Sequence, residues 1–303
     1  KNNLKFVFEG LDDDSNNFII DTIETETSTD RDGNTRELKR IKITPWKTFT
    51  ITNKLLNKFN HVIFLSATIT KEILEKETGI KDELIEEIKL EHIIPKENRH
   101  WEVVQEIDIP KYGMRNTERE KLVKKMNKEI EKIFDKHSGQ RGVILVPSHL
   151  LLNEIYDNAT PKMQERLVID YEDGKNNKNS KKFEKSFEEH MAKSDSVLLS
   201  ARISTGLDLK GDRSRFQIIP KVPWLPQVTT KYEKGKYPRA DKIYENDPGR
   251  FFIKSALQLV QYCGRSIRNK DDFAHTYILD SSIYKMLENN EKSIPKWFLE
   301  AGI

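Results

Sequence analysis

Four polar side chains recur at helical spacing near the C-terminal end of the chain: Gln258, Gln261, Arg265 and Arg268. Steps of three, four and three residues place them on one narrow face of a helix, which we expect to span residues 251–268. Arginine presents a planar fork of donors that matches the oxygens of a phosphate or carboxylate. This face is therefore typical of a site for a multiply charged oxyanion. The alternative is a solvated face that makes surface ion pairs.

An apolar stripe adjoins this face and predicts that the helix packs against a sheet. Its members are Leu257, Val260, Gly264 and Ile267. Gly264 lowers helix propensity by about 1 kcal/mol relative to alanine, so we expect a close approach of the backbone to a neighbour there. Cys263 is the single cysteine of the chain, which excludes an internal disulfide and a four-cysteine metal site. Its neighbours predict a small buried side chain and not a nucleophile.

The elements that must position this helix alternate between strands and helices. Apolar runs predict strands at residues 101–109, 142–146, 166–171, 196–200, 216–219 and 275–280. Helices are expected at residues 117–137, after Ser148 through Tyr156, and at 181–192, with two short ones at the C-terminus. This alternation implies right-handed crossovers and a mostly parallel α/β sheet with helices on both faces.

The first part of the chain has a different, β-rich pattern. Strands are predicted at residues 4–9, 17–24 and 38–44, with an Asp-Gly hairpin turn at residues 30–34. Residues 61–69 form an apolar run that predicts a buried parallel strand ending in the hydroxyls of Ser66 and Thr68. A helix capped by threonine is expected to follow at residues 71–78 and to end at Gly79.

The amino-acid composition limits the classes of protein to which this chain can belong. The 303 residues are 36% hydrophobic and 33% charged, enough for one large or two medium domains with a highly charged surface. No apolar run has the length of a membrane span and no signal peptide is evident, so we expect a cytoplasmic protein with no membrane partner. The net charge, 52 − 49 = +3, is too small to indicate nucleic-acid binding by itself. The chain begins with Lys1, and we expect it to be a piece of a longer polypeptide.

Four segments resemble, in sequence and order, motifs III to VI of superfamily 2 DNA helicases of the DinG/XPD type. They are Leu-Ser-Ala-Thr at 65–68, Val-Ile-Leu-Val-Pro-Ser at 143–148, residues 198–211, and Gln-Tyr-Cys-Gly-Arg-Ser-Ile-Arg at 261–268. The resemblance covers about residues 55–280. It implies that residues 1–75 are the β-rich C-terminal tail of motor domain 1, and that residues 76–303 are a RecA-like motor domain 2.

The resemblance also implies roles for the residues of a nucleotide site. ATP and Mg²⁺ would lie between the two motor domains, and Arg265 and Arg268 would act as arginine fingers supported by Gln261. Such groups stabilise the charge that develops during phosphoryl transfer. Further nucleotide contacts would come from Gly206, Asp208 and Gly264.

Contacts with single-stranded DNA are implied for a second set of residues. Ser148 would bind a phosphate at the N-terminus of a helix, where free N–H groups point outward. The motif V loop would add Arg202, Ser204 and Thr205, while Ser66 and Thr68 of motif III would couple hydrolysis to strand movement. The family usually carries a glutamate where this chain has Thr205.

The sequence contains neither a Gly-Lys-Ser/Thr phosphate loop nor an Asp-Glu-x-His box, both of which Mg²⁺·ATP binding requires. We therefore expect no metal site within this segment and no ATP hydrolysis without an N-terminal motor domain of the same polypeptide. One alternative is a degenerate, non-catalytic nucleic-acid-binding or assembly module. Thr205 and the absent phosphate loop favour it, while the arginine pair argues against it. An unrelated α/β transferase would leave the order of four motifs to coincidence.

Overall fold

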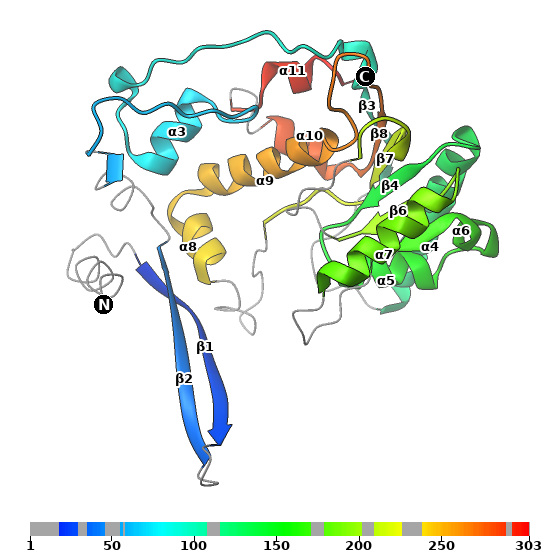
Figure 1. Ribbon diagram of the computed structural model, residues 1–303, viewed down its shortest axis with the longest axis horizontal. Coiled ribbons are helices and arrows are strands. Elements are labelled where there is room, and N and C mark those ends of the chain that lie inside the picture. Colours follow the sequence, from blue (N-terminus) through cyan, green and yellow to red (C-terminus); the bar gives the residue numbers. More distant parts are fainter. Residues whose placement is uncertain are drawn as a thin grey trace. The chain divides into compact units, whose positions relative to one another are not determined.

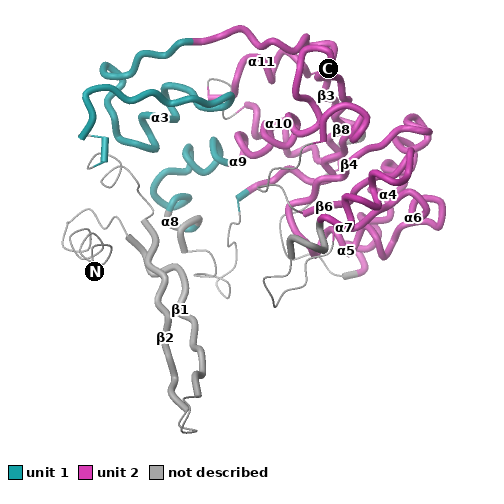
Figure 2. Tube along the Cα trace, in the orientation of Figure 1, with its two compact units in different colours: residues 1–88, 225–254 teal, residues 89–224, 255–303 magenta. Residues whose placement is uncertain are grey.

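The computed structural model describes residues 18–29, 35–45, 55–56, 58–107, 116–170, 179–201, 209–225, 238–288 and 293–302. The chain divides into two compact units (Figure 2). Unit 1 comprises residues 1–88 and 225–254, and unit 2 comprises residues 89–224 and 255–303. Helix α9 (Pro248–Cys263) begins in unit 1 and ends in unit 2.

Unit 1 contains an antiparallel hairpin of β1 (Phe18–Thr29) and β2 (Thr35–Pro45) (Figure 1). The register runs from Phe18 opposite Pro45 to Thr29 opposite Thr35, with a shift between Ile20 and Thr22. The strands predicted at residues 17–24 and 38–44 are confirmed, and both extend further toward the turn. The predicted strand at residues 4–9 and the Asp-Gly turn lie outside the described residues.

The helices of unit 1 are α3 (Lys71–Thr78), the 3₁₀ turn η1 (Asp82–Leu84), α8 (Pro238–Asn246) and the first turns of α9. Helix α3 has the predicted bounds. Thr70 caps it by accepting a hydrogen bond from the Ile73 N–H, and Gly79 ends it at φ 70°, a left-handed conformation that suits glycine. Helix α8 was not predicted from the sequence.

The predicted buried strand at residues 61–69 is wrong for this structure. No strand is assigned there, and the side chains of Ile63 and Leu65 are 84% and 92% exposed. A buried parallel strand needs hydrogen-bonded neighbours on its edges and a covered face. Among the described residues, no strand pairs with this segment. Its apolar side chains therefore remain at the surface.

Unit 2 is built on a sheet whose described strands are all parallel, in the order β3-β8-β7-β4-β6-β5 (Figure 1). The strands are β3 (Trp101–Ile107), β4 (Gly142–Leu145), β5 (Leu167–Ile169), β6 (Val197–Ser200), β7 (Phe216–Ile219) and β8 (His275–Asp280). Each coincides with a predicted strand, so the expected parallel sheet is confirmed.

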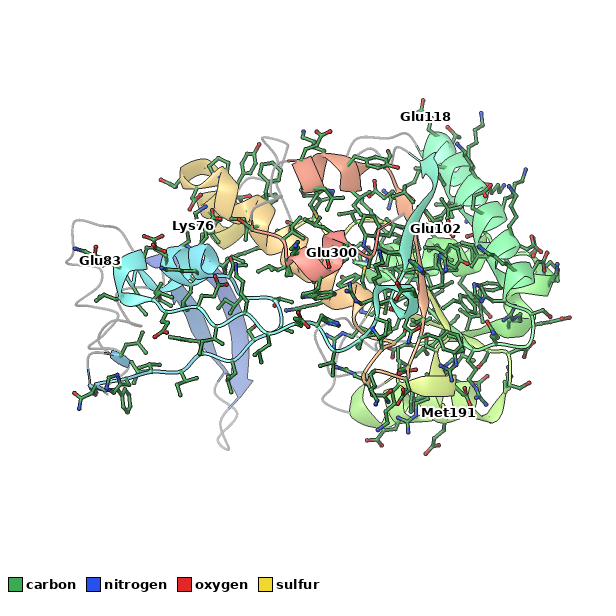
Figure 3. All side chains as sticks on the ribbon, turned by 90° about the horizontal axis from the view of Figure 1, so that it is seen from above. Lys76, Glu83, Glu102, Glu118, Met191 and Glu300 are labelled. Atoms are coloured by element: carbon green, nitrogen blue, oxygen red, sulfur yellow. The ribbon has the colours of Figure 1, made fainter. Side chains whose placement is uncertain are left out.

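Helices cover both faces of this sheet. They are α4 (Asn116–Lys136), α5 (His149–Asp157), α6 (Pro161–Arg166), α7 (Asn179–Ala192), α10 (Ser282–Glu288) and α11 (Lys296–Leu299), with 3₁₀ turns η2 (Lys96–Asn98) and η3 (Gly211–Arg213). Side chains alternate between faces along each strand. Val143 and Leu145 of β4 pack with α9, α10 and α11, while Ile144 packs with α4, α5 and α6. Figure 3 shows the side chains as sticks on the ribbon.

Candidate functional site

Helix α9 ends earlier than predicted, at Cys263, so the expected single helix over residues 251–268 is wrong. The Gly264 N–H still bonds to the Val260 carbonyl at 3.2 Å, but the Arg265 N–H bonds only three residues back, to Tyr262, at 3.1 Å. The side-chain amide of Gln217 donates to the Cys263 carbonyl at 2.6 Å. A carbonyl in the last turn of a helix has no partner within the helix. That of Cys263 receives its hydrogen bond from a side chain of the sheet, and the chain turns away after this residue.

The early end of α9 divides the four predicted polar residues into two groups. Gln258 and Gln261 lie on the helix, while Arg265 and Arg268 lie on the segment that follows it. Gln261 and Arg268 are exposed and Arg265 is half-buried. Residues 261–268 therefore present one amide and two guanidiniums from a turn and not from a continuous helical face.

The two guanidiniums interact electrostatically. Burial lowers the pKa of Arg265, and the positive charge of Arg268 lowers it further, while Tyr262 acts in the opposite direction. An anion beside two like charges would favour the charged form of each. Phosphate oxygens are suitable anions, because they accept charge-assisted hydrogen bonds from arginine forks.

Cys263 and Gly264 lie in the same segment. Cys263 is buried, and burial raises the pKa of its thiol, so the reactive thiolate is disfavoured. A Cβ placed on Gly264 would meet only carbonyl oxygens at 3.7 and 3.9 Å, which are ordinary contacts. Among the described residues, no protein atom therefore makes the close approach to Gly264 that the sequence predicts.

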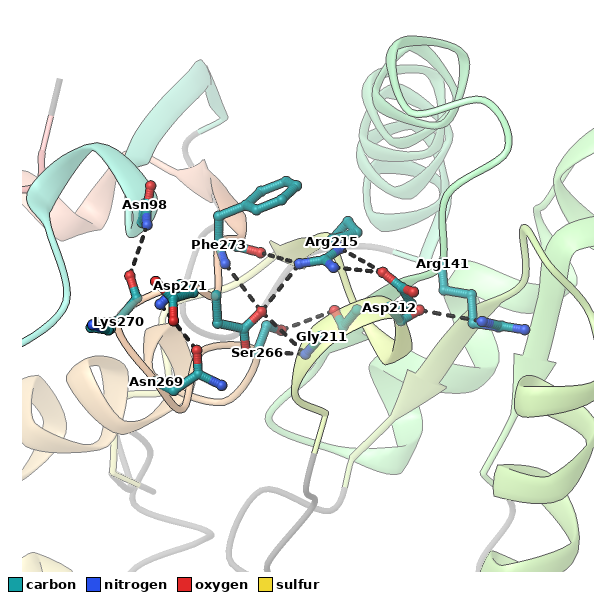
Figure 4. Close-up of polar contacts among 12 residues, drawn as sticks. Asn98, Arg141, Gly211, Asp212, Arg215, Ser266, Asn269, Lys270, Asp271 and Phe273 are labelled. Carbon is teal, nitrogen blue, oxygen red and sulfur yellow. Dashed lines mark hydrogen bonds and ion pairs between the residues drawn. The ribbon is translucent and has the colours of Figure 1, made fainter.

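A carboxylate that no motif marks, that of Asp272, joins Gly211 at the end of the motif V loop to the segment after Arg268; Gly211 and Arg215, its two partners, are labelled in Figure 4. Asp272 is 3% exposed and accepts hydrogen bonds from the N–H of Gly211 at 3.0 Å and from Arg215 Nη1 at 3.1 Å. Gly211 has φ 65°, which favours glycine. Asp272 therefore fixes the chain that leaves the loop against the chain that follows the arginines. Sequence reasoning missed it because an isolated aspartate in a polar loop has no distinguishing spacing.

Ser148 lies near the carboxyl ends of the parallel strands, whereas the segment with the arginine pair leads into the amino end of β8. Its Oγ caps α5 by accepting from the Leu151 N–H at 3.3 Å, just beyond the carboxyl end of β4. Gln217, which contacts the end of α9, pairs in register with Val143 near the start of β4. The structure thus separates Ser148 from the arginines along the strand direction, so these residues cannot share one small ligand.

The other predicted site residues divide between described and undescribed parts of the chain. Arg202, Ser204, Thr205, Gly206 and Asp208 lie outside the described residues. In unit 1, Ser66 Oγ accepts hydrogen bonds from the N–H groups of Thr68 and Ile69, both at 3.2 Å. The Ser-Ala-Thr segment therefore forms a hydroxyl-stabilised turn at the surface.

Within the described ranges, no helix combines the length and apolar character that crossing a membrane requires. The same part of the chain holds no group of three or more His, Cys, Asp or Glu side chains placed to bind a metal ion.

A family model described as "Helicase C-terminal domain" matches residues 130–301, more than half of the chain. A solved structure described as "XPD_Helicase" is 16% identical, with a TM-score of 0.56, covering 82% of this chain and 44% of that one. Another, described as "XPD_APO", is 17% identical, with a TM-score of 0.56, covering 96% and 57%. This chain therefore spans about half the length of these structures. No curated protein matches. The predicted RecA-like sheet, covered on both faces, is confirmed.

Proposed function

This chain belongs to the helicase C-terminal domain family, in keeping with its resemblance to DinG/XPD-type helicases, and we propose that it forms the second motor domain of an ATP-dependent DNA helicase. In this proposal residues 1–75 are the tail of motor domain 1 and residues 76–303 are motor domain 2. The N-terminal motor domain of the same polypeptide supplies the phosphate loop, the Asp-Glu-x-His box and the ligands of Mg²⁺. The complete protein acts in the cytoplasm.

The observation that carries this proposal is the placement of Arg265 and Arg268 together on the short segment that follows α9, with Arg265 half-buried and Arg268 exposed. The charge of Arg268 disfavours the charge of half-buried Arg265, so the pair is stabilised by an anion placed between or beside its forks. Bound ATP supplies a terminal phosphoryl group whose equatorial oxygens gain charge as it is transferred. Arg265 and Arg268 orient toward those oxygens and stabilise that charge, which is worth about 10³- to 10⁵-fold in turnover for an arginine finger.

The residues around the pair have supporting roles in this proposal. Gln261, one turn before Arg265, donates from its amide to the same phosphate network. Gly264 leaves the turn narrow enough for the nucleotide to approach. Gly206 and Asp208 of the motif V loop line the nucleotide edge, and the tie between Asp272 and Gly211 holds the end of that loop.

Single-stranded DNA is the proposed second ligand. Ser148 caps α5 at the carboxyl edge of the sheet, where ligands of parallel sheets bind. Its exposed N-terminal turn offers N–H groups to a backbone phosphate. Arg202, Ser204 and Thr205 extend this contact from the motif V loop. Ser66 and Thr68 of unit 1 couple hydrolysis to the movement of the strand. In this proposal DNA and the nucleotide bind at opposite ends of the strands, so the motor domain can hold both at once.

The proposal is tested with the complete polypeptide and with the present 303-residue chain, each assayed for ATP turnover with and without single-stranded DNA. We expect DNA-stimulated turnover from the complete protein and none from the 303-residue chain, which lacks the phosphate loop. We also expect Ser148→Gly to weaken DNA binding in a fluorescence anisotropy titration without changing turnover at saturating DNA. DNA binding by a complete protein that hydrolyses no ATP would instead identify a non-catalytic nucleic-acid module.

A further inference from the structure

Gln217 is a polar residue in the middle of an apolar sheet. It is the second residue of β7, its register partners are Val143 on β4 and Thr276 on β8, and it is fully buried. Neighbouring positions of the strand, Phe216 and Ile218, belong to the hydrophobic core. Burying an amide without hydrogen-bond partners costs about 1–3 kcal/mol in proteins. Its presence here therefore requires partners that satisfy it.

The amide finds those partners on α9 and on the adjacent strand. Gln217 Nε2 donates to the carbonyl of Cys263 at 2.6 Å and to Thr276 Oγ1 at 2.5 Å. Gln217 Oε1 lies 3.2 Å from the Ser266 hydroxyl, which is also 2.9 Å from Ser214 Oγ. Both N–H groups and the carbonyl oxygen of the side chain are thus used.

Two of these contacts flank Arg265 in the sequence. Cys263 is two residues before it and Ser266 is the residue after it, so one rigid side chain from the sheet holds both ends of the turn that carries the guanidinium. Because Cys263 and Ser266 are themselves buried, the turn cannot rotate without breaking these bonds. Arg268 follows two residues later on the exposed side.

We infer that Gln217 is a positioning residue for Arg265: its amide ends α9 at Cys263 and fixes the turn that directs the Arg265 guanidinium. This inference rests on the proposed function of the arginine pair. The amide suits the task because the carbonyl of Cys263 needs a donor and the hydroxyl of Ser266 needs an acceptor. An apolar side chain of similar length would supply neither, and a carboxylate would place an acceptor against a carbonyl.

The test is a double-mutant cycle in the complete polypeptide, measuring DNA-stimulated kcat and the Kd of ATP for wild type, Gln217→Met, Arg265→Ala and the double variant. We expect Gln217→Met to lower kcat about 10- to 100-fold, the range for a misplaced catalytic group, with little change in Kd. In the Arg265→Ala background the same substitution should change kcat by less than about 2-fold, because the group it positions is gone. Thr276→Val, which removes the third partner of the amide away from Arg265, is the matched control and should keep wild-type kcat.

Each outcome decides between the inference and its alternatives. An equal fold-loss from Gln217→Met in both backgrounds would show a general structural role and overturn the inference. Wild-type kcat in Arg265→Ala would overturn the proposed function itself, and the inference with it. If Gln217→Met fails to fold, Ser266→Ala replaces it in the cycle, since it removes one of the two flanking contacts and leaves the amide in place. A loss of kcat from Ser266→Ala that persists undiminished without the Arg265 guanidinium would overturn the inference equally.

Discussion

A buried ion-pair cluster in unit 1 offers a quantitative test of how α3 is held against the start of α9. The guanidinium of Arg250 donates to both oxygens of Glu77, at 2.8 and 2.7 Å, and Lys254 Nζ lies 3.0 Å from the same carboxylate. The Arg250 side chain is 5% exposed and that of Glu77 25%. Replacing Arg250 by methionine keeps much of the volume and removes both bonds of the fork, so Glu77 keeps only Lys254 as a charged partner in this cluster.

The expected cost follows from the burial of the carboxylate left behind. Removing one partner of a buried ion pair costs about 3–5 kcal/mol, because the other charge stays desolvated. Glu77 remains one-quarter exposed and retains Lys254, so we expect a cost below this range, about 2–3 kcal/mol at pH 7. This corresponds to about 30- to 150-fold faster amide hydrogen exchange across α3, since 1.36 kcal/mol is a factor of ten.

The loss of stability in Arg250→Met, called the deficit below, should depend on pH in a definite direction. Burial raises the pKa of Glu77, but the hydrogen bond from Arg250 and the charges of Lys254 and Arg250 outweigh it, so the pKa is lowered. In the wild type this stabilisation is present above the unfolded-state pKa and is lost as the pH falls through the folded-state pKa. In Arg250→Met burial is opposed by Lys254 without Arg250, so the pKa of Glu77 rises and protonation relieves the penalty. The deficit should therefore shrink between pH 7 and about pH 4.

Urea denaturation at several pH values measures the deficit, and hydrogen exchange at pH 7 locates it. Glu72→Gln is the matched control, because Glu72 pairs with Lys76 on the exposed side of the same helix, at 2.8 Å (Lys76 is marked in Figure 3). An exposed pair of this kind contributes less than about 0.5 kcal/mol. The reasoning is refuted if Arg250→Met costs no more than Glu72→Gln at pH 7, or if its deficit grows on acidification.

Two further predictions concern the sheet of unit 2. Arg166→Met should lower the free energy of unfolding by about 2–4 kcal/mol. The reason is that the guanidinium donates to backbone carbonyls at the end of α4 and, at 2.7 Å, to the carbonyl of Asp195. A urea titration that shows a loss below about 0.5 kcal/mol would contradict this. Gly142→Ala should lower the melting temperature, because its Cβ would overlap the ring of Phe216 and overpacking costs about 1–3 kcal/mol. Gly249→Ala, whose Cβ meets only an oxygen at 3.5 Å, is the control, and equal melting temperatures for the two variants would count against the packing argument.

Local sequence signals were sufficient for the elements of unit 2. Strand β4 and helix α4 were predicted within one or two residues, because an apolar run and a helical period are properties of contiguous residues. Gly139, in a left-handed conformation at φ 75°, prevents the helix from continuing beyond the turn that follows α4. The strand order β3-β8-β7-β4-β6-β5 was not predicted, since it depends on contacts between segments far apart in the sequence.

The errors near the site have the same origin. The helical period of the C-terminal motif continues through Arg268, but Gln217, 46 residues before Cys263, takes the Cys263 carbonyl and ends the helix. Motif spacing identified Arg265 and Ser148 as candidate site residues. It could not identify Gln217 or Asp272, whose importance lies only in which backbone groups they reach in the folded protein. The strand predicted at residues 61–69 failed because pairing requires a neighbour as well as an apolar run.

The most direct test of the proposed motor function is the steady-state ATP turnover of Arg265→Ala in the complete polypeptide with saturating single-stranded DNA. Lys270→Ala is the matched control, because Lys270 is an exposed cation on the same segment, and its backbone carbonyl, which the substitution keeps, accepts a hydrogen bond from Asn98 Nδ2 at 3.2 Å. We predict a fall in kcat of about 10³-fold or more for Arg265→Ala, with the Kd of ATP nearly unchanged, and wild-type turnover for Lys270→Ala. Equal turnover in wild type and Arg265→Ala would contradict the account.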